Sequence, residues 1–368
     1  MMAGLEGFIP LDLYSMIQVV LLGFIGGVLS GFIGSGGAFF MTPGMMNLGV
    51  PGAIAVASNI THKFGKALVG SRRHRELGNV DRKLALYMLA TSAAGIQIAV
   101  WLNSMLFNAT GSHGASSSAA GDLYISVVFV ASLSLVSLSM LRDVSHSFRA
   151  GDSSSRPGSR LTEMVASLRL PPTIDFRVSE THVSLWIVLL VGLAVGYMAG
   201  TIGVGGFLGV PAMIYLFGVP TTVAAGTELY LAVYMGAWGA LNYAWLGLVD
   251  VRMTLLLYGG SLVGVFIGAY GTKVVREIMI RMVTGVVIIV CVISRLIAIP
   301  VYLRQLGVMH MDPSWDAYLN GASKVLLFLA GFSGLAMILY LVVRAHRQRV
   351  RIQARLMQTC SQPDRASG

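Results

Sequence analysis

A glycine-rich motif occurs twice in this chain. The first copy is GFIGSGG at residues 31–37, and the second is GTIGVGG at residues 200–206. The same offset of 169 residues aligns 31–100 with 200–269 without a gap, and 18 of these 70 pairs are identical, mostly as glycine, proline, aspartate and small apolar residues. Because these residue types shape the backbone, the sequence predicts two copies of one fold unit.

The composition indicates a membrane protein. The chain is 55% hydrophobic and 11% charged, with a mean hydropathy of +0.74, whereas soluble domains have about 25% charged residues. Several apolar runs reach the length of about 20 residues that a helix needs to cross the hydrocarbon core. The 44 glycines are typical of closely packed membrane helices. We therefore expect an all-α integral membrane protein.

Apolar periodicity predicts about nine spans, if each helix interrupted by the glycine motif counts as one. Four form the first repeat, four form the second, and one is unrepeated. Their expected ranges are 13–33, 52–72, 83–106, 123–141, 183–202, 221–246, 253–272, 278–299 and 321–343. The first span is expected to be retained, since residues 1–11 contain no Lys or Arg to begin a signal peptide.

The chain is expected to divide into five parts. These are a first membrane repeat (1–141), an extramembrane linker (142–182), a second membrane repeat (183–300), a loop with an extra span (301–343) and a basic tail (344–368). The tail should contact anionic lipid headgroups of the bilayer rather than nucleic acid. Nothing in the sequence specifies an oligomeric state.

Orientation is left open by the charges. The turn at 72–83, the linker and the tail are all basic, but nine simple spans cannot place all three on one side. Either a glycine-rich segment re-enters the membrane, or one loop departs from the positive-inside tendency.

The two glycine motifs are the first candidates for a substrate site. A break inside an apolar span frees N–H and C=O groups that only protein or a watery cavity can satisfy. Freed amides at the start of the next helix form a site for anions, with about half a positive charge. Close helix crossing is the alternative use of the glycines. The candidate binding residues are Gly34, Ser35, Gly36, Gly37, Gly203, Gly205 and Gly206.

The expected helix 52–72 carries polar residues on one face, namely Asn59, His62, Lys63 and Lys66. A lysine near the centre of a span costs about 2.5–3.5 kcal/mol, so a polar cavity is expected beside it. Asn59, Lys63 and Lys66 are therefore candidate binding residues. Lys66 has the alternative of extending to the membrane surface. His62 is either a proton carrier or a hydrogen-bonded interior histidine.

Glu228 is the one carboxylate well inside an expected span. The offset of 169 residues places it opposite Asn59 and places Thr227 opposite Ser58. Thr227 is a candidate binding residue, and Glu228 is a candidate for proton coupling because an intramembrane carboxylate commonly serves function. The alternative is a structural ion pair between Glu228 and Lys63 or Lys66. Both interpretations place the two polar helices face to face.

The duplicated Gly-Xaa-Gly-Gly, the Gly-Val-Pro turns and the Gly-Xaa-Val-Asp segments resemble the TauE/SafE family of sulfite-exporter-like permeases over about residues 15–300. The resemblance is strongest in Gly200–Gly268. The first copy departs from the pattern, since Pro43 lies one residue later than the counterpart of Pro211 and the following helix carries lysines. The resemblance implies a secondary transporter of small anionic sulfur compounds in the plasma (inner) membrane of a prokaryote.

We therefore expect a permease that exports sulfite, sulfonates or related organosulfur anions, coupled to protons. A channel-like anion pore and a transporter of another small carboxylate or oxyanion are the alternatives. An enzyme is not expected, because the sequence offers neither metal-ligand spacing nor a nucleophile with its base. The two cysteines, Cys291 and Cys360, suggest no disulfide framework, and no metal or other cofactor is expected.

Overall fold

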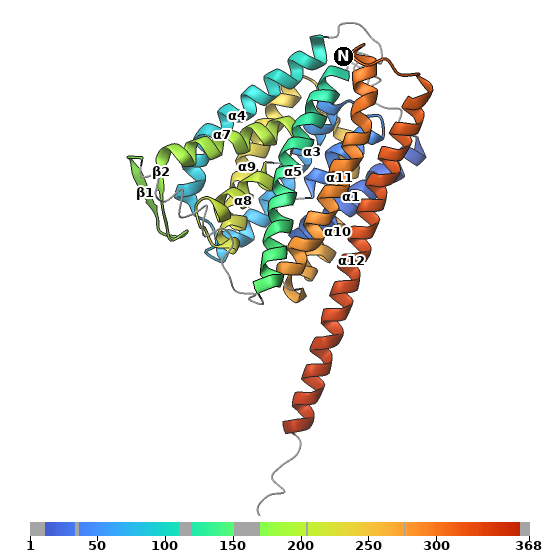
Figure 1. Ribbon diagram of the computed structural model, residues 1–368. Coiled ribbons are helices and arrows are strands. Elements are labelled where there is room, and N and C mark those ends of the chain that lie inside the picture. The colour runs from blue at the N-terminus through green and yellow to red at the C-terminus, as the bar shows by residue number, and fades with distance from the viewer. Residues whose placement is uncertain are drawn as a thin grey trace, which may run out of the picture.

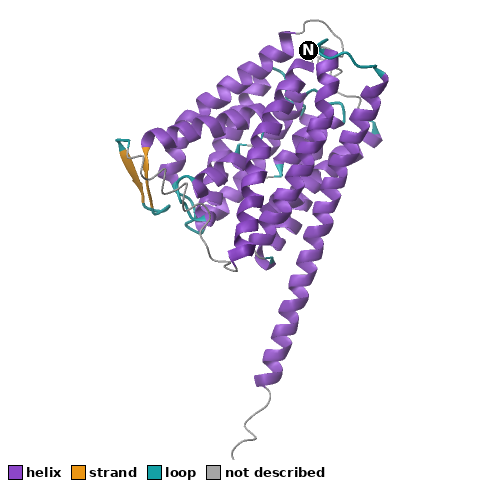
Figure 2. Ribbon diagram, viewed as in Figure 1, coloured by secondary structure: helices purple, strands orange, loops and turns teal. Residues whose placement is uncertain are grey.

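The computed structural model describes residues 12–33, 37–109, 119–150, 170–203, 205–275 and 277–360. Most of these residues are helical, and the helices form one bundle (Figures 1 and 2). The helices are α1 (Leu13–Ile33), α2 (Ala38–Asn47), α3 (Gly52–Glu76), α4 (Arg82–Ala109), α5 (Ala119–Ala150), α7 (Leu185–Ile202), α8 (Gly206–Tyr215), α9 (Thr221–Trp245), α10 (Val251–Val274), α11 (Glu277–Gln305) and α12 (Ser314–Cys360). Strands β1 (Thr173–Phe176) and β2 (Thr181–Ser184) pair as an antiparallel hairpin.

Seven of the described helices are long and apolar enough to cross a membrane, namely α1, α4, α5, α7, α10, α11 and α12. The chain is therefore an all-α integral membrane protein, as the sequence predicts. Helices α3 and α9 also occupy expected span positions, but they are more polar and fall outside this set. Helix length and hydropathy therefore do not establish the predicted count of nine spans.

Glycine lines two interfaces between the copies, where α1 packs along α10 and α4 packs along α7. A Cβ added to Gly23 would lie 2.6 Å from the carbonyl oxygen of Leu257, and one added to Gly192 would lie 2.5 Å from that of Met88. Only glycine lets the backbones approach this closely. At the offset of 169 residues, Gly23 corresponds to Gly192 and Met88 to Leu257. The two interfaces are therefore the same contact with the copies exchanged.

The chain reverses direction at each glycine motif, because α2 runs back along α1 and α8 runs back along α7. The contacts that show this are Gly26 with Met41 and Leu22 with Gly44 in the first copy, and Ala199 with Gly205 and Val195 with Gly209 in the second. This corrects the interpretation of each interrupted segment as one span. The short helix after the motif returns toward the side from which the long helix came.

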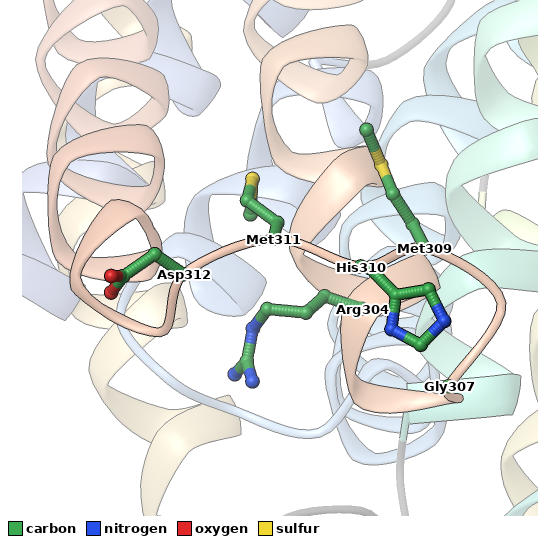
Figure 3. A pocket seen from close by; sticks show the side chains of 6 residues that line it. All are labelled: Arg304, Gly307, Met309, His310, Met311 and Asp312. Atoms are coloured by element: carbon green, nitrogen blue, oxygen red, sulfur yellow. The ribbon is translucent and has the colours of Figure 1, made fainter.

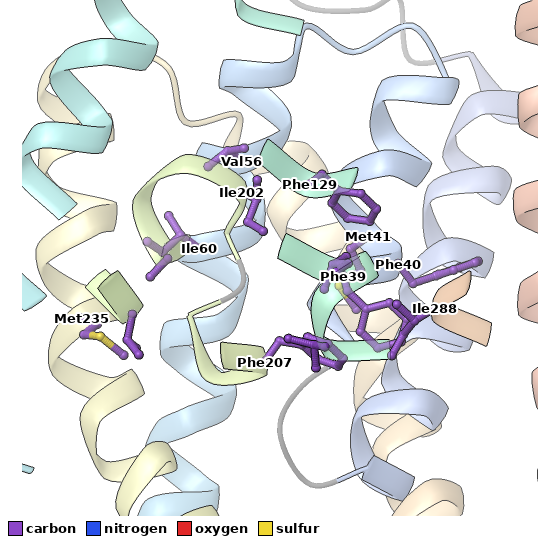
Figure 4. Packing of buried hydrophobic residues seen from close by; sticks show 14 of the residues in the cluster. Phe39, Phe40, Met41, Val56, Ile60, Phe129, Ile202, Phe207, Met235 and Ile288 are labelled. Carbon is purple, nitrogen blue, oxygen red and sulfur yellow. The ribbon is translucent and has the colours of Figure 1, made fainter. Parts of the chain in front are cut away.

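The two short helices meet at their N-terminal turns. The rings of Phe39 in α2 and Phe207 in α8 lie 5.3 Å apart between centroids, and both side chains are buried (Figure 4). Figure 4 also places Met41, Ile202 and Phe129 in this cluster. The apolar core thus brings together two helix N-termini, each of which carries partial positive charge.

Corresponding helices of the two copies face each other in opposite directions. In the pair α3 and α9, the contacts are Ile60 with Gly239, Phe64 with Gly236 and Gly70 with Leu229. In the pair α5 and α11, Asp143 near the end of α5 meets Arg281 near the start of α11, with 2.8 Å between Oδ2 and Nη1. Figure 1 shows α5 and α11 side by side.

Secondary structure crosses the boundaries expected from the sequence. Helix α5 continues past residue 141 to Ala150, and α12 continues past residue 343 to Cys360. The predicted linker therefore contains the end of α5 and the β1–β2 hairpin, while much of the predicted tail is helical.

Asp81 attaches the hairpin to the helical bundle. Its Oδ2 accepts hydrogen bonds from the backbone N–H of Ser179 at 3.1 Å and from the Ser179 hydroxyl at 2.8 Å. Its Oδ1 caps α4 by accepting the N–H of Leu84 at 3.0 Å, which is a common role for aspartate before a helix. The turn between α3 and α4 and the hairpin therefore lie at the same end of the bundle.

Two neighbouring glycines in α10 test the close helix contact. A Cβ on Gly260 would collide with the backbone of Val20 in α1, whereas a Cβ on Gly259 would meet nothing within 4 Å. We expect Gly260→Ala to lower the free energy of unfolding by about 1–3 kcal/mol through overpacking. Gly259→Ala should leave it unchanged or raise it by about 0.5–1 kcal/mol, because alanine favours a helix. Unfolding of the purified variants measures the difference, and equal stabilities would contradict the tight α1–α10 contact.

Candidate functional site

A buried ion pair joins α3 to α9. Lys63 Nζ lies 2.9 Å from Glu228 Oε1, and the two side chains are 8% and 1% exposed. Buried charges of opposite sign are stable when they remain paired, and removing one of them leaves a costly unpaired charge. Of the two alternatives that the sequence left open for Glu228, the structure has the ion pair, with Lys63 rather than Lys66 as the partner.

The Glu228 carboxylate lies at the N-terminus of α8. A Cβ on Gly206, the first residue of α8, would collide with this carboxylate. The partial positive charge of the helix N-terminus therefore adds to that of Lys63 in stabilising it. Oε2 of Glu228 has no hydrogen-bond partner among the described residues. The protein's own carboxylate thus occupies the place where the second glycine motif was expected to hold an anion.

Asn59 connects α3 to the second glycine motif. Its Nδ2 donates a hydrogen bond to Thr42 Oγ1 in α2 at 2.8 Å, and the Thr42 hydroxyl donates to the carbonyl of Ile202 at 2.9 Å. Gly203 follows with a φ of 77°, a left-handed conformation that favours glycine. A Cβ on Gly203 would lie 3.0 Å from Asn59 Nδ2. Asn59 and Thr42 therefore support the reversal of the chain between α7 and α8.

Lys66 and His62 contact helices that the ion pair does not use. Lys66 Nζ donates a hydrogen bond to Ser30 Oγ in α1. His62 Nε2 lies 2.6 Å from Ser261 Oγ in α10, and the centroids of the His62 and Tyr258 rings lie 4.8 Å apart. These contacts favour the hydrogen-bonded interior histidine over the proton carrier. They also leave Lys66 as a cation with no ion-pair partner among the described residues.

Thr227 links the site to the hairpin. Its Oγ1 accepts a hydrogen bond from the backbone N–H of Asp81 at 3.0 Å. Because Asp81 also bonds to Ser179, Thr227 connects the residue next to it, Glu228, with the linker between the copies. This contact does not involve Lys63, so the structure separates Thr227 from the ion pair.

The predicted glycine residues differ in what they face. Gly203 and Gly206 face the polar side chains of α3 and α9, while Gly37 and Gly205 pack on the preceding long helices. Gly34, Ser35 and Gly36 lie outside the described residues. The sequence analysis missed Ser30, Thr42 and Ser261, since a lone hydroxyl in an apolar run gives no signal of its own.

A separate surface pocket of about 510 Å³ lies at the loop between α11 and α12 (Figure 3). Its lining residues are Arg304, Gly307, Met309, His310, Met311 and Asp312. Arg304 Nε donates to Asp316 Oδ1 at 2.7 Å, so this pocket's cation is already paired. The pocket includes none of the predicted site residues. The described residues also contain no group of three or more His, Cys, Asp or Glu side chains that could hold a metal ion.

Membrane-length helices that enclose buried charges and two helix N-termini are typical of secondary transporters. The family described as "Sulfite exporter TauE/SafE" matches residues 19–295, and the chain belongs to this family. It is therefore a membrane transporter and not an enzyme.

Two similar proteins come from Bacillus subtilis (strain 168). "Probable membrane transporter protein YjnA" is 26% identical over 256 residues, which cover 69% of this chain and 89% of the relative. "Probable membrane transporter protein YunE" is 24% identical over 284 residues, which cover 75% and 95%. No solved structure gives a significant match. The family resemblance drawn from the repeated motifs is confirmed.

The two lysines of α3 provide a matched test of the ion pair. We expect Lys63→Met to lower the free energy of unfolding by about 3–5 kcal/mol, because it leaves the Glu228 carboxylate buried and unpaired. Lys66→Met removes one hydrogen bond to Ser30 and should cost about 1–3 kcal/mol. Adding Glu228→Gln should restore much of the loss caused by Lys63→Met but none of that caused by Lys66→Met. Additive effects of the first pair would contradict direct coupling between Lys63 and Glu228.

Proposed function

We propose that the protein is a proton-coupled exporter of a small anionic sulfur compound, such as sulfite, a sulfonate or a related organosulfur anion. The membrane is the plasma (inner) membrane of a prokaryote. The family description names sulfite export, and the two similar bacterial proteins are described as membrane transporters. The observation that carries the proposal is the buried Lys63–Glu228 pair at the N-terminus of α8.

In this mechanism, the Glu228 carboxylate and the substrate anion compete for the same positive charges. Protonation neutralises Glu228 and releases Lys63 Nζ. A compact oxyanion then binds to Lys63, Asn59 and the amides at the start of α8, which suit an anion. One proton and one negative charge enter together, so the loaded site has the same net charge as the empty one. Deprotonation of Glu228 restores the ion pair and expels the anion.

Lys66 supports the choice of an anion over a cation. With Lys63 and Glu228 neutralising each other, Lys66 leaves a net positive charge beside Ser30, which precedes the first glycine motif. Positive charge inside a membrane protein attracts anions and repels cations. Two helix N-termini in the same region act in the same direction.

Anion binding should strengthen as the pH falls, because each bound anion requires protonated Glu228. An alkanesulfonate is a suitable probe, since its own charge stays constant over this pH range. Glu228→Gln mimics the protonated carboxyl, so it should bind the probe without pH dependence. Lys63→Met should weaken binding by about tenfold or more, because a charge-assisted hydrogen bond is lost. Calorimetric titration of purified protein measures these affinities.

Lys83→Met is a matched control, because Lys83 is an exposed lysine that bonds to the carbonyl of Asp175 in the hairpin. It should bind the probe as the wild type does. A pH dependence that survives in Glu228→Gln would overturn the proposed coupling. In proteoliposomes, flux that does not saturate and is not accelerated by substrate on the opposite side would indicate a channel-like pore instead.

The two copies form an inverted pair in the proposed topology. Corresponding helices run antiparallel, and the α1–α2 and α7–α8 hairpins each return to the side where they begin. The hairpins then enter the membrane from opposite sides, and α3, α4, α5, α9, α10, α11 and α12 cross it. Each hairpin would replace one of the nine predicted spans.

This topology places all three basic segments on one side. The α3–α4 turn is bonded to the linker hairpin, and the end of α5 meets the start of α11. Helix α12 turns back along α11, with the Ser323 hydroxyl donating to the Ser294 carbonyl at 2.8 Å, so the tail leaves beside the start of α11. The turn, the linker and the tail therefore share the cytoplasmic side, as the positive-inside tendency requires.

Cysteine labelling tests the topology in a background without Cys291 and Cys360. Val178 in the hairpin and Val308 in the α11–α12 loop are both exposed. An impermeant maleimide should label Val308→Cys in intact cells, whereas Val178→Cys should react only after the cells are permeabilised. Labelling of both in intact cells would contradict the proposed sidedness.

A further inference from the structure

Arg295 in α11 is a buried charge that the Lys63–Glu228 site does not use. Its side chain is 1% exposed, and it lies in a candidate membrane span, Ile278–Gln305. Its Nη2 donates to the Tyr302 hydroxyl at 3.2 Å, and its guanidinium carbon lies 5.9 Å from the centre of the Tyr302 ring. Nε and Nη1 have no hydrogen-bond partner, and no described carboxylate forms an ion pair with Arg295.

The polar groups next to Arg295 are bonded to one another instead. The Ser294 hydroxyl donates to the Ser323 carbonyl at 2.7 Å, and the Ser323 hydroxyl lies 3.1 Å from Asn47 Oδ1. Arginine stays protonated even when it is buried. A guanidinium in a span is costly without a negative charge and acceptors for its N–H groups. One small anion would supply both.

Ser126 in α5 provides a second polar group without a partner. Its side chain is fully buried, and its Oγ makes no hydrogen bond among the described residues. The antiparallel contact of α5 with α11, anchored by Asp143 and Arg281, places Ser126 opposite the turn of α11 that follows Arg295. The charge of Asp122, one turn before Ser126, acts on Tyr302, which agrees with this register.

Asp122 is the acidic group that could otherwise balance Arg295. Its Oδ1 accepts the backbone N–H of Gly52 at 2.6 Å, so it caps the start of α3. It forms no ion pair with Arg295. The carboxylate is therefore committed to another helix, while the guanidinium keeps two free donors.

We propose that Arg295, Ser126 and Tyr302 form a second anion site, between α5 and α11, which takes a small monovalent inorganic anion such as chloride. The guanidinium supplies charge and two N–H donors, and the two hydroxyls supply the remaining hydrogen bonds. This site is separate from the one proposed for the transported anion. It stabilises the packing of α5 on α11, the last helices of the two copies.

Chloride-dependent stability of the purified protein tests this site. Replacing gluconate by chloride at constant ionic strength should raise the unfolding temperature of the wild type with a saturable dependence. Arg295→Met should lose this dependence, and in gluconate it should be at least as stable as the wild type because a buried unpaired charge is gone. Arg281→Met, on the same helix but paired with Asp143, is the matched control and should keep the chloride response.

Two milder variants keep the test decisive if Arg295→Met does not fold. Ser126→Ala and Tyr302→Phe each remove one hydroxyl and should weaken the apparent chloride affinity by about tenfold, the value of one hydrogen bond to a charged group. The double variant Lys63→Met/Glu228→Gln should keep the wild-type response, because it alters only the proposed transport site.

Three results would overturn the proposal. The first is a wild type whose stability does not respond to chloride. The second is Arg295→Met that is strongly destabilised in both salts, which would make Arg295 a structural partner of Asp122. The third is an unchanged chloride affinity in both hydroxyl variants. A chloride response lost in Lys63→Met/Glu228→Gln would instead assign the bound anion to the transport site and would also overturn it.

Discussion

The buried ion pair of Lys63 and Glu228 sets the main constraint on this structure. Two opposite charges away from water must remain within contact distance, so α3 and α9 have to pack face to face. Each of these helices also contacts the short helix of its own copy, α2 or α8. The pair therefore fixes where the N-terminus of α8 lies relative to the polar face of α3, and with it the site.

Glycine makes this arrangement sterically possible. Backbones approach closely where α1 meets α10 and where α4 meets α7, and the two interfaces exchange when the copies are superposed by sequence offset. Such contacts hold helices together without a hydrophobic driving force, which is absent between helices in lipid. They leave the centre of the bundle for α3, α9 and the two short helices, where polar groups can bond to protein rather than to lipid.

The copies share a backbone but differ in charge. Asn59 corresponds to Glu228, while Lys63 and Lys66 correspond to Ala232 and Met235. The first copy thus contributes the cations and the second the carboxylate. A symmetric pair of copies could not form this ion pair, because each would present the same charge to the other. Divergence of a few side chains on a duplicated frame is therefore what turns two helical units into one polar site.

Composition and periodicity were sufficient to predict a helical membrane protein with two related copies, because burial in lipid requires apolar helices and duplication leaves a constant offset. The polar face of α3 and the role of Asn59, Lys63 and Glu228 as neighbours also followed from the sequence. The reversal at the glycine motifs did not, because glycine permits a bend without specifying its direction. Nor did the sequence choose between Lys63 and Lys66, or reveal Thr42 and the unpaired Arg295. Partners that lie far apart in the chain are decided by packing, and only the tertiary structure specifies it.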